Sequence, residues 1–203
     1  MTDHAPVPAP RPDTVRDRAA AVFDLDARLP AQVFRELADE AVFYPFDTLL
    51  TPDAWPALTA LAGLHGDRRI DLLVVAADGD VVPALSLPVD ATPDDYWARV
   101  GFEEDGDAWE SVTIAARTVA LTGPSGRWGC WGERDPEVAV LRGFPGEAAR
   151  RDWCARHGPA LDVAGVLGSW LRPVFRDRRV PAAYAAELTA HYGASRRPSD
   201  APG

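Results

Sequence analysis

Cys154 and His157 are the two residues of this sequence whose types and spacing best suit chemistry. They lie three positions apart in a segment, 146–157, that we expect to be helical, so their side chains share one face. A thiol beside an imidazole forms a nucleophilic pair or supplies two ligands of a zinc site. The competing interpretation is structural, because a cysteine in an arginine-rich helix is commonly a small packing residue.

The other Cys and His residues do not complete a metal site. A structural zinc ion needs four ligands, and these residues show no paired spacing. They are Cys130, His4, His65 and His191. The sequence therefore predicts neither a metal nor another cofactor.

The absence of Lys excludes several enzyme classes, because all 21 basic residues are Arg. The chain cannot form an internal Schiff base and lacks the P-loop lysine, the kinase strand lysine and a Ser-Lys dyad. Lys, Asn and Ile are encoded by AT-rich codons, and their scarcity indicates a GC-rich bacterial genome. We leave open whether the chain is an enzyme, and we lean towards a non-catalytic protein.

Trp128 and Trp131 form the densest aromatic feature, in the run Trp-Gly-Cys-Trp-Gly. Alternation along a strand places the two indoles on opposite faces of a sheet. One is expected in the core, and the other is a candidate exposed platform on which a ligand stacks. The alternative is that both are structural, since indoles pack well on sheets.

Charge is unevenly distributed along the chain, whose net charge is -10. Up to Leu141 there are 11 Arg against 25 acidic residues, a balance of -14, whereas the rest of the chain is basic. The extreme is the segment 90–110, and its predicted partner-binding carboxylates are Glu103, Glu104, Asp105 and Asp107. Such a segment repels nucleic acid and attracts a basic protein partner, although acidic loops also serve only to keep a protein soluble.

A cluster of arginines near the C-terminus carries the opposite charge. It consists of Arg172, Arg176, Arg178 and Arg179. Two interpretations stay open: these side chains contact the acidic segment within the molecule, or they bind an anion outside it.

The elements that position these residues follow from apolar periodicity and turn signals. We expect helices at 33–42, 51–63, 92–100, 146–157, 160–175 and 181–192. Strands are expected at 70–77 and 81–87, forming a hairpin, and at 112–122, 127–132 and 137–142, forming a three-stranded meander. The sequence therefore predicts an α+β fold with an antiparallel sheet of about five strands, packed by N- and C-terminal helices.

One domain, 18–193, is expected between two disordered tails, 1–17 and 194–203, which are rich in small and polar residues. No apolar stretch is long enough for a membrane span, so we expect a protein that does not enter a membrane. The N-terminal segment lacks the pattern of a secretory signal, and two cysteines are too few for a disulfide scaffold. We therefore expect a bacterial cytoplasmic protein.

Two functions remain. The first is a non-catalytic protein that binds another protein through its acidic surface, for example in an immunity or antitoxin-like role against a basic effector. The second is a small enzyme whose site uses carboxylates and Arg, or Cys154 with His157. The first is favoured, because no nucleophile or base stands out from the sequence.

Overall fold

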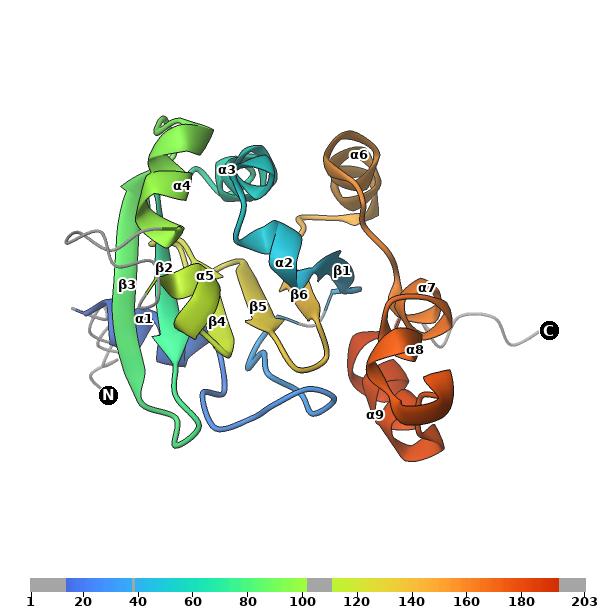
Figure 1. Cartoon of the computed structure of the whole chain (residues 1–203). Helices are drawn as coiled ribbons and strands as arrows, with labels where there is room; N and C mark the ends of the chain where they lie inside the picture. The colour runs from blue at the N-terminus through green and yellow to red at the C-terminus, as the bar shows by residue number, and fades with distance from the viewer. Residues whose placement is uncertain (1–13, 38, 102–110, 194–203) are drawn as a thin grey trace, which may run out of the picture.

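The computed structural model describes residues 14–37, 39–101 and 111–193 of the chain. Within these residues, six strands form one sheet in the order β1-β6-β5-β4-β2-β3, and every neighbouring pair is antiparallel. The strands are β1 (Val42–Pro45), β2 (Arg69–Val75), β3 (Val81–Pro88), β4 (Thr118–Thr122), β5 (Gly129–Glu133) and β6 (Val138–Arg142). Helices pack on the sheet, so the α+β prediction is confirmed (Figure 1).

The helices of the described residues range from single turns to three turns. They are α1 (Val15–Val22), α2 (Phe46–Leu49), α3 (Trp55–Gly63), α4 (Pro93–Val100), α5 (Val112–Ala115), α6 (Glu147–His157), α7 (Val163–Gly168), α8 (Leu171–Val174) and α9 (Ala182–Tyr192), with the 3-10 helices η1 (Pro52–Ala54) and η3 (Arg176–Arg178). In the part of the chain that the structure describes, none of them has the length and apolar character needed to cross a membrane.

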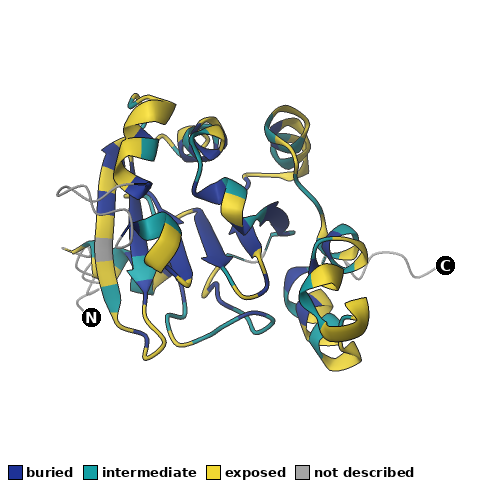
Figure 2. Cartoon of the chain, in the orientation of Figure 1, coloured by how far each residue is buried: buried dark blue, intermediate teal, exposed yellow. Residues whose placement is uncertain are grey.

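Both faces of the sheet are covered. Every residue of the central strands β4, β5 and β6 is buried, and Figure 2 shows the strands dark blue inside helices that are yellow outside. Alternation along β5 sends Cys130 to one buried cluster and Trp131 to the other. The two faces therefore carry two separate cores.

The first face, on the side of Cys130, is covered by α2 to α6. Its largest side chains are those of Trp55, Tyr96, Trp128 and Trp153, all at most 2% exposed. Trp55 stacks on Tyr96, with ring centroids 4.9 Å apart. This contact fixes α4 against the start of α3.

The second face, on the side of Trp131, is covered by α1, by an irregular segment and by α7 to α9. The irregular segment comprises the described residues 23–37 and 39–41, between α1 and β1. Arg142 is only 2% exposed, and its guanidinium donates to the carbonyls of Leu37 and His191. The Tyr192 hydroxyl accepts from the Val33 amide at 3.0 Å and donates to the Ala31 carbonyl at 2.6 Å. The irregular segment is thus held by side chains from β6 and α9.

The hairpin and the meander are confirmed, but a sixth strand, β1, was missed. The predicted helix at 33–42 is wrong, because Phe34 pairs with Phe23 in a β-bridge and the Val33 amide is used by Tyr192. Val33, Phe34 and Ala41 are buried in a segment that is irregular and not helical, and β1 begins at Val42.

Three other predictions need correction. The segment 112–122 begins as the short helix α5 and becomes strand only at Thr118. The segment 160–175 is two helices, because Ser169 ends α7 with a backbone (φ -133, ψ -82) that is not helical. These helices cover the β1 end of the second face of the sheet (Figure 1). α1 includes the last three residues of the expected N-terminal tail, and the rest of both tails lies outside the described residues.

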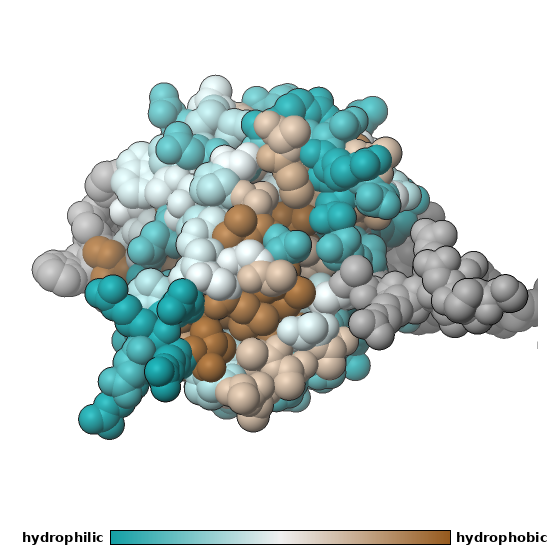
Figure 3. Space-filling model, turned by 90° about the vertical axis from the view of Figure 1, so that its right-hand side faces the viewer, coloured by the Kyte–Doolittle hydropathy of each residue, from teal (hydrophilic) through white to brown (hydrophobic). Residues whose placement is uncertain are grey.

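The side of the molecule formed by the C-terminal helices has an apolar band across its middle, bordered by hydrophilic side chains (Figure 3). Half-buried side chains of α7 to α9 that pack against the second core include Val163, Leu167 and Tyr184. This side therefore combines core packing with a partly apolar surface.

Candidate functional site

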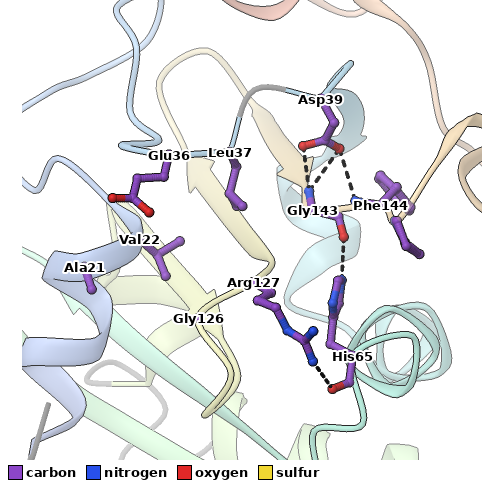
Figure 4. A pocket seen from close by; sticks show the side chains of 11 residues that line it. Ala21, Val22, Glu36, Leu37, Asp39, His65, Gly126, Arg127, Gly143 and Phe144 are labelled. Carbon is purple, nitrogen blue, oxygen red and sulfur yellow. Dashed lines mark hydrogen bonds between the residues drawn. The ribbon is translucent and has the colours of Figure 1, made fainter. Parts of the chain in front are cut away.

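A polar cleft with a volume of about 370 Å³ lies where α1, the irregular segment, the end of α3 and the turn after β6 meet. We call it the Asp39 cleft. Its polar side chains are those of Glu36, Asp39, His65 and Arg127 (Figure 4). They come from three widely separated parts of the sequence.

Asp39 holds the turn after β6. Its carboxylate accepts from the Gly143 amide at 3.0 Å and from the Phe144 amide at 3.1 Å. Gly143 has φ +99, and a Cβ there would lie 2.3 Å from the Arg127 carbonyl oxygen, so the turn requires glycine. Both carboxylate oxygens of Asp39 are therefore engaged in structural hydrogen bonds.

His65 bridges the two walls of the cleft. Its Nε2 lies 2.5 Å from the Gly143 carbonyl, which can only accept, so Nε2 carries the proton. This leaves Nδ1 as the nitrogen that can accept a proton. Arg127 donates to the His65 carbonyl at 3.0 Å and keeps its remaining donors for an anion. The cleft therefore presents one imidazole nitrogen that can accept a hydrogen bond, on His65, beside the guanidinium of Arg127.

A second cavity, of about 460 Å³, contains the buried carboxyl group of Glu133. Its Oε1 accepts from the Leu29 amide at 2.8 Å and from the Trp131 indole at 2.7 Å. Burial raises the pKa of Glu133 despite these two hydrogen bonds. The group orders the loop after α1 and holds the Trp131 ring in place.

Cys154 and His157 lie on α6, as expected, but their surroundings oppose a reactive pair. Burial raises the pKa of the Cys154 thiol, and nearby Arg150 offsets this only in part. Burial and the charge of Arg156 lower the pKa of His157, whose ring lies against Trp153 at 5.6 Å. Both shifts favour the neutral forms. Among the described residues, no group of three or more His, Cys, Asp or Glu side chains is placed to hold a metal ion.

Trp128 and Trp131 lie on opposite faces, as alternation predicts, but both are 0% exposed. Of the two interpretations of these indoles, the exposed stacking platform is wrong and the structural one agrees with their burial, because helices cover both faces of the sheet. The Trp128 indole donates to the Asp67 carboxylate at 2.8 Å. The two rings are core residues with satisfied N–H groups.

The predicted carboxylates Glu103, Glu104, Asp105 and Asp107 lie outside the described residues. The described part of the acidic segment is exposed around α4, at Asp90, Asp94 and Asp95. Asp53 of η1 is also exposed, and η1 contacts α4. Four carboxylates therefore surround one end of the molecule.

The four clustered arginines lie at the other end, on α8, on η3 and directly after it, and all are exposed. Figure 1 shows α4 and α8 on opposite sides of the sheet. No ion pair joins any of the four to another described residue. The four arginines therefore do not contact the described part of the acidic segment, which was the first of the two interpretations of this cluster.

The residues of the two cavities were missed by the sequence analysis. Asp39, His65 and Arg127 meet only through the tertiary fold, and no local spacing marks them. Glu133 had one available signal, because it is a carboxylate at the end of an otherwise apolar strand. Such a position predicts a buried acid with a structural or chemical role.

No family model, no curated protein and no solved structure matches the chain. The functional argument therefore depends on the sites themselves.

Proposed function

We propose that this chain is a non-catalytic, bacterial cytoplasmic protein that binds a basic protein through its acidic surface, as an immunity or antitoxin-like protein binds an effector. The observation that carries the proposal is the gathering of exposed carboxylates from Asp53, Asp90, Asp94 and Asp95 around α4. The segment 102–110 continues this acidic run in the sequence. These carboxylates outnumber the exposed Arg99 of the same helix, and a surface with an excess of negative charge attracts a basic partner.

The acidic end is built on a rigid support. The Tyr96 hydroxyl donates to the Leu49 carbonyl at 2.9 Å, and the Trp55 indole donates to the Ala91 carbonyl at 2.7 Å. Thr92 and Asp95 form a capping box at the start of α4. A surface that is ordered before binding loses less entropy when the partner arrives.

Hydrogen bonds favour the charged form of Asp95. The Thr92 amide and hydroxyl donate to its carboxylate and lower its pKa. The neighbouring Asp90 and Asp94 are exposed to water. The capping box of α4 therefore contributes negative charge to the surface that a basic partner would approach.

The cavities support the binding proposal over the enzyme alternative. Asp39 and Glu133 each use carboxylate oxygens to hold the chain, and the thiol of Cys154 is kept neutral by burial. An enzyme of the carboxylate and Arg type would need such groups released towards a substrate. The side chains of Asp90 and Asp94, by contrast, make no hydrogen bond that holds the described part of the chain.

The test is to isolate the partner on immobilised chain from native cell extract and to measure its association rate with variants. D53N/D90N/D94N should slow association about three- to tenfold at low salt, and raising salt should remove the difference, because exposed charges act mainly on encounter. Asp95 is left intact because it caps α4.

The matched control is E147Q/D152N/E187Q, which removes the same charge from exposed helical positions elsewhere. Its association rate should stay close to that of the wild type. The proposal fails if the two triple variants slow association equally, or if neither variant nor salt changes the rate.

A further inference from the structure

The surface of α7 to α9 combines aromatic, aliphatic and basic side chains, and Figure 3 shows hydrophobic and hydrophilic residues next to each other on this side of the molecule. We call it the C-terminal patch. Its half-buried members are Val163, Leu167, Trp170, Val174, Phe175, Val180 and Tyr184, and its exposed members are Arg172, Arg176, Arg178 and Arg179. Aromatic residues and Arg are the types enriched where binding energy concentrates in protein interfaces.

The charge of the patch is not neutralised within the described residues. The side chain of Arg172 donates to the Arg178 carbonyl at 3.4 Å, which leaves its charge uncompensated. By contrast, Arg18 pairs with Asp71 at 2.7 Å and Arg150 with Glu40 at 2.6 Å. Arg18 of α1 and Arg150 of α6 are thus paired, whereas the arginines of the patch are available to an external carboxylate.

The backbone beneath the arginines is held in an unusual conformation. Asp177 and Arg178 both have positive φ, at 57° and 54°, and this region is unusual for Arg178 because residues other than Gly, Asn, Asp and His rarely adopt it. The turn is held by the Arg178 amide, which donates to the Phe175 carbonyl at 3.0 Å, and by the contact with Arg172. The strained turn fixes where its arginines leave the surface.

Two aromatic side chains of the patch have polar groups without partners in the described structure. Trp170 is half-buried, and its indole N–H has no protein acceptor, unlike the indoles of Trp55, Trp128 and Trp153. The Tyr184 hydroxyl is buried and has no hydrogen-bond partner. A bound chain offering oxygen acceptors would satisfy the Trp170 N–H.

From these observations we infer that the C-terminal patch binds an acidic protein segment that carries apolar side chains between its carboxylates. The carboxylates pair with the four arginines, and the apolar side chains pack on Trp170 and Phe175. Nucleic acid fits less well, because the chain as a whole has a net charge of -10 and repels a polyanion at long range. This site lies apart from α4, so it is independent of the function proposed above.

A labelled synthetic peptide tests the inference with the full chain by fluorescence anisotropy. The probe is a short run of glutamates interrupted by Leu and Trp, compared with a run of glutamates alone and with single-stranded DNA. The interrupted peptide should bind more tightly than either competitor. Affinity should fall as salt rises through about 0.15 M, where the screening length is about 8 Å.

The test variant is R176E/R179E, because neither side chain has a hydrogen bond or ion pair with another described residue. It should bind the interrupted peptide about tenfold more weakly, since two attractions become repulsions. The control R68E/R151E changes the net charge by the same amount at exposed positions elsewhere and should stay within about twofold of the wild type.

Several results would overturn the inference: equal loss in the two variants, tighter binding of the DNA, equal binding of the uninterrupted peptide, or no binding at low salt. Thermal unfolding of each variant checks the fold. Should R176E/R179E unfold, R176Q/R179Q replaces it, with R68Q/R151Q as its control and the same criteria.

Discussion

The two faces of the sheet attach their covering helices by different chemistry. On the first face, neutral N–H and O–H groups donate to backbone carbonyls, as when the Trp153 indole of α6 donates to the Ala57 carbonyl of α3 at 2.9 Å. On the second face, buried charged groups take part as well: Arg142 of β6 donates to the Leu37 carbonyl, and Arg18 of α1 donates to the Asp71 carboxylate. The Arg142 contact follows from what is attached, because the irregular segment has backbone carbonyls that no regular helix or strand uses.

A buried charged side chain needs an opposite charge or several hydrogen bonds beside it, whereas a buried neutral group needs only one hydrogen-bond partner. Asp71 is 0% exposed, and its carboxylate accepts from Arg18 at 2.7 Å and from Ser86 at 2.6 Å. Losing one member of such a set leaves an uncompensated charge, whereas losing a neutral donor leaves one carbonyl. The second face should therefore be the more sensitive of the two to single substitutions.

Breaking the ion pair should have the largest effect. Arg18→Met should lower the free energy of unfolding by up to about 3–5 kcal/mol, because the buried charge of Asp71 loses its closest charged partner. The carboxylate keeps only Ser86 and the longer contact with Arg69 at 3.5 Å. Urea unfolding followed by circular dichroism measures the change. R18M/D71L should recover most of the loss, since it removes both charges. A double variant as unstable as R18M would mean that packing of α1, and not charge, is responsible.

Removing a neutral hydrogen bond on the first face should cost less. Trp153→Phe deletes the donor to Ala57 and leaves a smaller ring, so we expect a loss of about 1–3 kcal/mol. The loss is measured at pH 8, where the lowered pKa of His157 keeps the imidazole that lies against the Trp153 ring neutral. If W153F were as costly as R18M, the comparison between the faces would not hold.

The smallest effect concerns Glu133 and appears in the pH dependence of stability. Burial raises its folded pKa above the ordinary value of 4.5, so the folded state binds more protons than the unfolded state in the window just above that value. Stability from this group is therefore present at low pH and is lost as pH rises through the folded pKa.

Glu133→Gln keeps an oxygen acceptor for Leu29 and Trp131 but cannot ionise. The stability of E133Q relative to the wild type should therefore increase as pH rises from 4.5 to 8, in unfolding curves recorded at each pH. Gln32, which also lies on the second face, provides a control in Q32A, whose offset should not vary with pH. A relative stability of E133Q that falls with pH would contradict the assignment.

The sequence predicted the regular half of this molecule better than the irregular half. Turn residues such as Gly79 and the Thr92 cap are local signals, so the hairpin and α4 were found. The segment 33–42 has helical spacing, yet contacts from Arg142 and Tyr192 keep it extended, and no local pattern contains those partners. The same holds for the Asp39 cleft, whose side chains converge only after folding.

Burial explains the remaining error. Alternation placed Trp128 and Trp131 on opposite faces, but it cannot say whether a face is open or covered. Here the second face is covered by α1 and the C-terminal helices, which come from distant parts of the chain. The charge asymmetry of the sequence was more informative than this alternation, because the acidic residues around α4 and the arginines of α8 and η3 are exposed at opposite ends of the molecule.

The contact of Tyr192 with residues 31 and 33 has a consequence for how the protein is made. The two partners of the Val33 bond are 159 positions apart, so a ribosome working at about 5–20 residues per second needs roughly 8–30 s to synthesise the second after the first. The first core uses residues between Val42 and Trp153 and can close earlier, whereas the second includes Phe23 and Phe34 and must wait for α9. Until then we expect Phe23 and Phe34 of the nascent chain to remain exposed to water.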